Sequence, residues 1–129
     1  MSSTSVCHTA KKAPNQQRVI EREITIEYKS VDEICTILAE NPAVEILKFY
    51  NCWNKITSPV ISAIFTLKHL TSLDLRGNQI GAASVSEIAK NLVGSNLTSL
   101  YLGSNYIGDA GASEIVNHLD GSNLQSLRL

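Results

Sequence analysis

A leucine-rich pattern returns with a 27-residue period in the second half of the chain. The segment Leu70–Ile80 reads Leu-Thr-Ser-Leu-Asp-Leu-Arg-Gly-Asn-Gln-Ile, and Leu97–Ile107 reads Leu-Thr-Ser-Leu-Tyr-Leu-Gly-Ser-Asn-Tyr-Ile. A third copy starts at Leu124, and an earlier one starts at Val44, which is one position closer to Leu70 than the period requires. Because a fixed period of this length is the mark of repeat architectures, we expect a stack of similar units.

Each unit is expected to contain a strand, a turn and an amphipathic helix. In the strand, Leu73 and Leu75 share one side, because successive side chains of a strand alternate. In the helix, two apolar positions one turn apart lie on one face. Both recur with the same 27-residue spacing, at Ile34, Ile61, Ile88 and Ile115 and at Leu38, Phe65, Leu92 and Leu119. Neither element can bury its apolar side alone, so the units must stack on one another.

The first unit is shorter than the others. Ile24 and Ile26 match the paired apolar residues of a strand, and residues 31–40 match the helix. The interval from Ile26 to Ile34 is several positions shorter than the equivalent interval in the later units. This leaves no room for the turn and predicts an N-terminal capping unit.

The second unit has an irregular loop. One residue is missing after Cys52 relative to the later units, which accounts for the shorter spacing between Val44 and Leu70. We expect Trp53 or Ile56 to fill the resulting gap; the alternative for Trp53 is an exposed aromatic anchor at the rim.

The pattern L-x-x-L-x-L-x-x-N/C-x-I-G, followed by a helix, resembles the leucine-rich repeats of the ribonuclease-inhibitor class. The resemblance covers about residues 20–129 and implies an α/β solenoid, with a curved parallel sheet on its concave side and helices on its convex side. A structural turn ladder is expected at the N/C position, because a side-chain amide there can bond backbone groups that the turn would leave buried and unpaired. This position is held by Cys52, Asn78 and Asn105.

These observations predict the domain organisation. Residues 1–17 are polar and without period, so we expect a disordered tail there. The leucine-rich repeat domain is expected over 18–129. Its expected parts are a capping unit at 18–43, repeats at 44–69, 70–96 and 97–123, and the start of a further repeat at 124–129.

Residues between the strand leucines are expected on the concave side. One row across the sheet reads Thr25, Lys48, Asp74, Tyr101 and Arg128, and the next reads Glu27, Tyr50, Arg76 and Gly103. Tyrosine and arginine are favoured anchors of protein interfaces. The alternative is a solvated face whose charges pair across strands. The predicted partner-binding residues are Lys48, Tyr50, Asp74, Arg76, Tyr101 and Arg128.

Catalytic and metal-binding patterns are not evident. His8, His69 and His118 fall at unrelated places in the repeat, and Cys7, Cys35 and Cys52 lack metal-ligand spacing. The glycine-rich turns do not form a phosphate-binding loop. We therefore expect no enzyme activity, no cofactor and no metal.

The chain has 129 residues and a formal net charge of -1, which gives no electrostatic argument for nucleic acid or for a membrane surface. Irregular cysteines and the lack of a secretory signal favour the cytosol, or a host cytosol for a bacterial effector. The expected function is non-catalytic protein binding. The alternatives are a regulator of a partner enzyme (an inhibitor or GTPase activator) and a fragment of a larger immune-receptor-type or effector protein. The strand at the C-terminus predicts an open edge that could self-associate.

Overall fold

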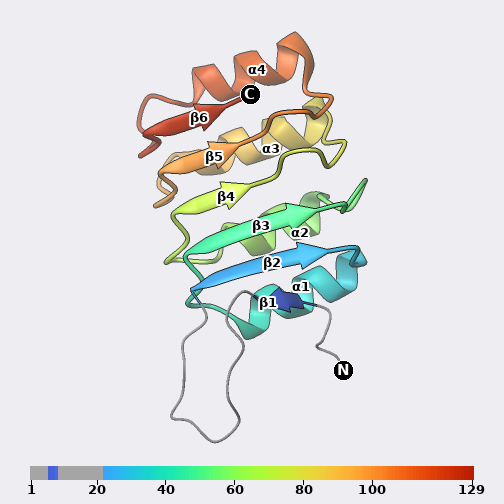
Figure 1. Ribbon diagram of the computed structural model, residues 1–129. Helices are drawn as coiled ribbons and strands as arrows, with labels where there is room; N and C mark the ends of the chain where they lie inside the picture. Colours follow the sequence, from blue (N-terminus) through green and yellow to red (C-terminus); the bar gives the residue numbers. More distant parts are fainter. Residues whose placement is uncertain (1–5, 9–21) are drawn as a thin grey trace, which may run out of the picture.

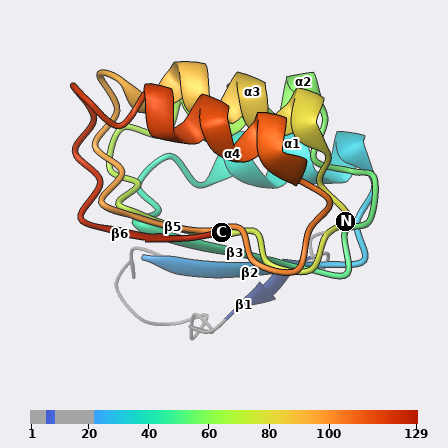
Figure 2. The ribbon, with the colours of Figure 1, turned by 90° about the horizontal axis from the view of Figure 1, so that it is seen from above.

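The computed structural model describes residues 6–8 and 22–129, which form a sheet with helices along one face (Figures 1 and 2). Strands and helices alternate along the chain after β2. The elements are β1 (Val6–His8), β2 (Glu23–Glu27), α1 (Val31–Glu40), β3 (Ile46–Tyr50), α2 (Ser58–Ile64), β4 (Ser72–Asp74), α3 (Ala82–Leu92), β5 (Ser99–Tyr101), α4 (Gly108–Asn117) and β6 (Ser126–Arg128).

The sheet order follows the chain, β1-β2-β3-β4-β5-β6. Strands β2 to β6 are parallel, and the repeated leucines lie side by side: Leu47 pairs with Leu73, Leu73 with Leu100, and Leu100 with Leu127. Figure 2 shows the helices in a layer above the sheet. The chain is therefore an α/β solenoid, as the period of the sequence predicts.

The core fills the space between the sheet and the helix layer. Four side chains of one unit have 0% exposure. Leu73 lies in β4, Leu75 directly follows β4, and Ile88 and Leu92 lie in α3. The isoleucines of the helical repeat position are also fully buried in every unit. Burial of one such side chain contributes about 1.5–3 kcal/mol, so this column provides much of the driving force for stacking.

Helix α1 begins with a capping box, which explains why the short first unit still forms a helix. The Ser30 hydroxyl accepts a hydrogen bond from the Glu33 backbone N–H at 3.1 Å, and the Glu33 carboxylate accepts one from the Ser30 N–H at 2.9 Å. Both bonds satisfy N–H groups that lack a partner inside the helix. These bonds start α1 at Val31, so only residues 28–30 separate it from β2.

Two expectations require correction. Residues 6–8 form β1, which pairs antiparallel with β2, so the disordered tail predicted for 1–17 is wrong at these three residues. The rest of that range lies outside the described residues. Trp53 does not fill the gap after Cys52: it is 46% exposed, whereas Ile56 is 4% exposed and lies in the core. The backbone is left-handed at Asn54 (φ 61°), and the smaller Ile56 side chain then enters the apolar interior.

None of the described helices is long and apolar enough to cross a membrane.

Candidate functional site

The predicted turn ladder lies at the carboxyl ends of the strands. Asn78 is 1% exposed, and its side-chain oxygen accepts a hydrogen bond from the Cys52 N–H at 2.8 Å. Its amide nitrogen donates to the carbonyls of Phe49 and Arg76, both at 3.0 Å. One side chain therefore satisfies backbone groups of its own turn and of the preceding unit.

Asn105 repeats this arrangement one unit later. Its oxygen accepts from the N–H groups of Asn78 (2.8 Å) and Ile80 (2.9 Å), and its nitrogen donates to Leu75 (2.9 Å) and Leu102 (2.8 Å). In the earlier unit the Cys52 thiol takes this place, with longer contacts to carbonyl oxygens. Burial raises the pKa of this thiol, so it stays protonated. The ladder fixes the point where each strand ends.

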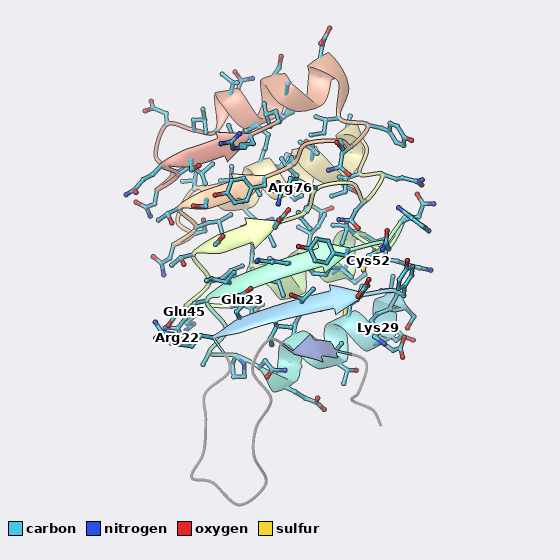
Figure 3. All side chains as sticks on the ribbon, in the orientation of Figure 1. Arg22, Glu23, Lys29, Glu45, Cys52 and Arg76 are labelled. Carbon is cyan, nitrogen blue, oxygen red and sulfur yellow. The ribbon has the colours of Figure 1, made fainter. Side chains whose placement is uncertain are left out.

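The sheet face opposite the helices, called the open face below, carries the predicted binding residues. Strand register places Lys48 beside Asp74, Asp74 beside Tyr101, and Tyr101 beside Arg128. Tyr50 lies in register with Glu27 of β2, and Gly103 lies next to the aliphatic part of the Arg76 side chain. The structure thus brings both predicted rows together, and Figure 3 shows Arg76 on this face.

Asp74 and Arg76 form the most constrained pair on the open face. Arg76 Nε donates to Asp74 Oδ1 at 3.0 Å, and Nη2 donates to Oδ2 at 2.7 Å. The Arg76 backbone N–H also donates to Oδ1, at 3.1 Å. The Asp74 side chain is only 5% exposed, whereas that of Arg76 is 55% exposed. Asp74 therefore holds Arg76 and presents little surface of its own, and its hydrogen bond raises the pKa of Arg76.

Arg76 also lies over an aromatic ring. Its guanidinium carbon is 5.6 Å from the centre of the Tyr101 ring, within the range of a cation–π contact. Hydrogen bonds to the side chains of Ser126 and Ser99 lower the pKa of Tyr101, opposed by partial burial. Tyr50, from the neighbouring strand, is 40% exposed. Arg76, Tyr50 and Tyr101 thus form a cluster of anchors on a rigid sheet.

Glu23 is an open-face residue outside the predicted set. Its carboxylate is 3.0 Å from Lys48 Nζ, and this bond raises the pKa of Lys48. Glu23 is two residues before Thr25, so the alternation of the strand could have placed it on this face. Figure 3 shows it at the start of β2.

A second aromatic feature lies beyond the ends of β2 and β3. Tyr28 is 66% exposed and packs edge-on against Trp53, with ring centres 6.3 Å apart and planes at 84°. The sequence carries only a weak signal for Tyr28, because this residue lies outside the repeat motif. These rings add exposed aromatic surface at one rim of the sheet.

Within 6–8 and 22–129, no three His, Cys, Asp or Glu side chains lie close enough to hold a metal ion. His118 contacts the Glu114 carbonyl at 2.8 Å, near the end of α4 on the helix side. It is therefore not part of the open face.

Two segments of the chain, residues 66–89 and 95–116, match the family model described as Leucine Rich repeat. They include Asn78 and Asn105 of the turn ladder, and β4 and β5 of the sheet. No curated protein matches the chain.

Proposed function

We propose that the chain, which carries leucine-rich repeats at residues 66–89 and 95–116, is a non-catalytic module that binds another protein through its open face. Domains of this repeat type generally mediate protein–protein binding. Rows of side chains on stacked strands provide an extended surface for such contacts. The 27-residue period and the α-helix in each unit support the ribonuclease-inhibitor-like class of repeat.

The observation that carries this proposal is the fixed position of Arg76. Two hydrogen bonds to Asp74 and the ring of Tyr101 restrain a side chain that remains more than half exposed. A restrained side chain loses less conformational entropy when a partner binds, so it contributes more to affinity. Arginine and tyrosine are also the residues most often responsible for interface energy.

The test compares two variants in partner capture. Replacing Tyr50, Arg76 and Tyr101 with alanine removes the exposed anchors and leaves Asp74 in place. A matched control, Lys90→Ala with Val116→Ala, changes exposed residues of the helix side. Immobilised wild-type chain and both variants are incubated with the same proteome, and captured proteins are identified by mass spectrometry.

We expect the open-face variant to lose the partner that the wild type and the helix-side control retain. Circular dichroism must show the same thermal transition for all chains within a few degrees. Equal capture by all three would refute the assignment of binding to the open face.

The two cysteines whose side chains the structure describes are consistent with a reducing compartment such as the cytosol. Cys35 and Cys52 are both free thiols, and Cys52 is part of the turn ladder as a hydrogen-bonding thiol. Oxidising compartments favour disulfides in small domains.

A further inference from the structure

We propose that the part of the open face formed by β3 to β6 recognises an acidic protein segment, through carboxylates that bind Arg76 and Arg128. This inference rests on the proposed binding function and adds the chemistry of the partner. It is carried by the distribution of charge on the face, by the donors that remain free at Arg76, and by a row of hydroxyl groups.

Charge is unevenly distributed across the open face. The open-face side chains of β3 to β6, and of the residue two positions beyond β4, include three cations and one carboxylate. The cations are Lys48, Arg76 and Arg128, and the carboxylate is Asp74. Lys48 is paired with Glu23 of β2, so the formal excess on β4 to β6, from Asp74, Arg76 and Arg128, is one positive charge, although the whole chain has a net charge of -1. The acidic residues Glu23 and Glu27 both lie on β2, at one side of the face. An acidic segment would be attracted toward β4–β6 and repelled from β2, which defines its placement.

The carboxylate of Asp74 does not reverse this attraction. It is buried under Arg76, and two of the five guanidinium N–H groups point to it. Three N–H groups therefore remain for a partner, and a guanidinium edge matches a carboxylate in a two-bond geometry. Arg128, one strand beyond Tyr101, is exposed. None of the ion pairs in the described part of the chain includes it.

Hydroxyl groups add donors in the row next to that of Arg128. Ser72 pairs with Ser99, and Ser99 with Ser126, so the three serines form a row on the open face. The Tyr101 hydroxyl interacts with two of them. Hydroxyl and guanidinium groups together satisfy the several lone pairs of a carboxylate. A nucleic acid fits less well, because it favours a broad basic surface and this face has an acidic side.

The experiment uses the full chain labelled with ¹⁵N and a blocked peptide of alternating glutamate and glycine as the probe. Matched peptides replace each glutamate with glutamine or lysine, and an oligothymidine of ten nucleotides represents nucleic acid. We expect only the glutamate peptide to cause saturable shifts of backbone amide signals. These shifts should be concentrated in β4, β5 and β6 and should disappear at about 1 M salt, where charges are screened beyond roughly 3 Å.

Two double variants separate local recognition from net charge. Arg76→Gln with Arg128→Gln removes two positive charges from the open face, and Lys68→Gln with Lys90→Gln removes two exposed charges away from it. We expect the first to weaken peptide binding about tenfold and the second to change it less than about twofold. Arg128→Gln alone, which leaves the Asp74–Arg76 pair intact, should weaken binding about threefold. Amide spectra of the free variants establish that each is folded.

Equal weakening by both double variants would overturn the inference, as would tighter binding of the oligothymidine or shifts confined to the helices. Failure here is distinguishable from failure of the proposed function. The glutamate peptide could fail to bind while the alanine variant still loses its protein partner. That result would reject the proposal of an acidic partner and leave the proposal of binding through the open face intact.

Discussion

At the scale of single residues, one backbone position recurs with a left-handed conformation. The open-face row of Glu27, Tyr50, Arg76 and Gly103 is followed in each unit by a residue with positive φ. This angle is 56° at Tyr28, 55° at Asn51, 72° at Gly77 and 59° at Ser104. Glycine adopts this conformation without strain, and asparagine tolerates it better than other residues with a side chain. The repeat therefore requires the conformation even where the sequence does not supply glycine.

This position predicts opposite effects for two substitutions. Ser104→Gly should raise the free energy of unfolding by up to about 1 kcal/mol, because it relieves a left-handed serine. Gly77→Ser should lower it by about 1–2 kcal/mol, although no neighbour would collide with the new side chain. Urea denaturation of both variants measures the difference. If both substitutions changed the free energy of unfolding in the same direction, the left-handed backbone conformation would not explain the effects.

Other residue-scale features were only partly predictable. The ladder positions could be predicted because Asn78 and Asn105 lie one repeat period apart within a strong motif. The burial of Asp74 could not, because it depends on the side-chain conformation of Arg76, which folds back over the carboxylate. A periodic pattern places a residue on a face, but it does not say how much of that residue a neighbour covers.

At the scale of elements, the helix bounds expected from the sequence match the structure best where capping residues mark the end of a helix. Residues 31–40 were expected as a helix and form α1 with these bounds, because Ser30 and Glu33 fix its start. Agreement was poorer at helix ends: Phe65 and Leu119 were expected on helical faces, but α2 ends at Ile64 and α4 at Asn117. Apolar spacing continues beyond each helix because both residues still pack against the core.

The capping box of α1 predicts a defined response to pH. Hydrogen bonds from Ser30, its backbone bond first, lower the pKa of Glu33. A depressed folded pKa means that the contribution to stability is present above the ordinary glutamate pKa, about 4.3, and is lost as the pH falls through the lower folded value. Glu33→Gln should remove this part of the acid response, since glutamine can still accept the Ser30 bond.

Thermal unfolding followed by circular dichroism between pH 6 and 3 would measure the effect. The melting temperature of wild type should fall more steeply below pH 5 than that of the variant. Asp32→Asn, on the same first turn but outside the capping bonds, is the matched control. Parallel curves for wild type and Glu33→Gln would exclude the proposed coupling.

At the scale of the whole molecule, stability depends on contact between neighbouring units. Ile88 has 0% exposure, and its helix packs against α2 on one side and α4 on the other. Ile88→Ala should therefore lower the free energy of unfolding by about 2–5 kcal/mol, through lost burial and a residual cavity. Because units are coupled to their neighbours, amide hydrogen exchange should accelerate in both β3 and β5.

The matched control for this substitution is Val93→Ala, at a position that is 50% exposed. It should change the free energy of unfolding by less than about 0.5 kcal/mol. Acceleration of exchange limited to α3 after Ile88→Ala would show that the units open independently and would contradict coupling between them.

The thiol in the turn ladder has a practical consequence. Cys52 is 1% exposed, and its burial keeps the thiol protonated. A thiol-modifying reagent can therefore reach it only when the junction between β2, β3 and the turns that follow them opens. The alkylation rate of Cys52, compared with that of the half-buried Cys35, therefore measures how often the solenoid opens locally at this junction. A bound partner that bridges several strands would lower the alkylation rate of Cys52 without contacting its sulfur atom.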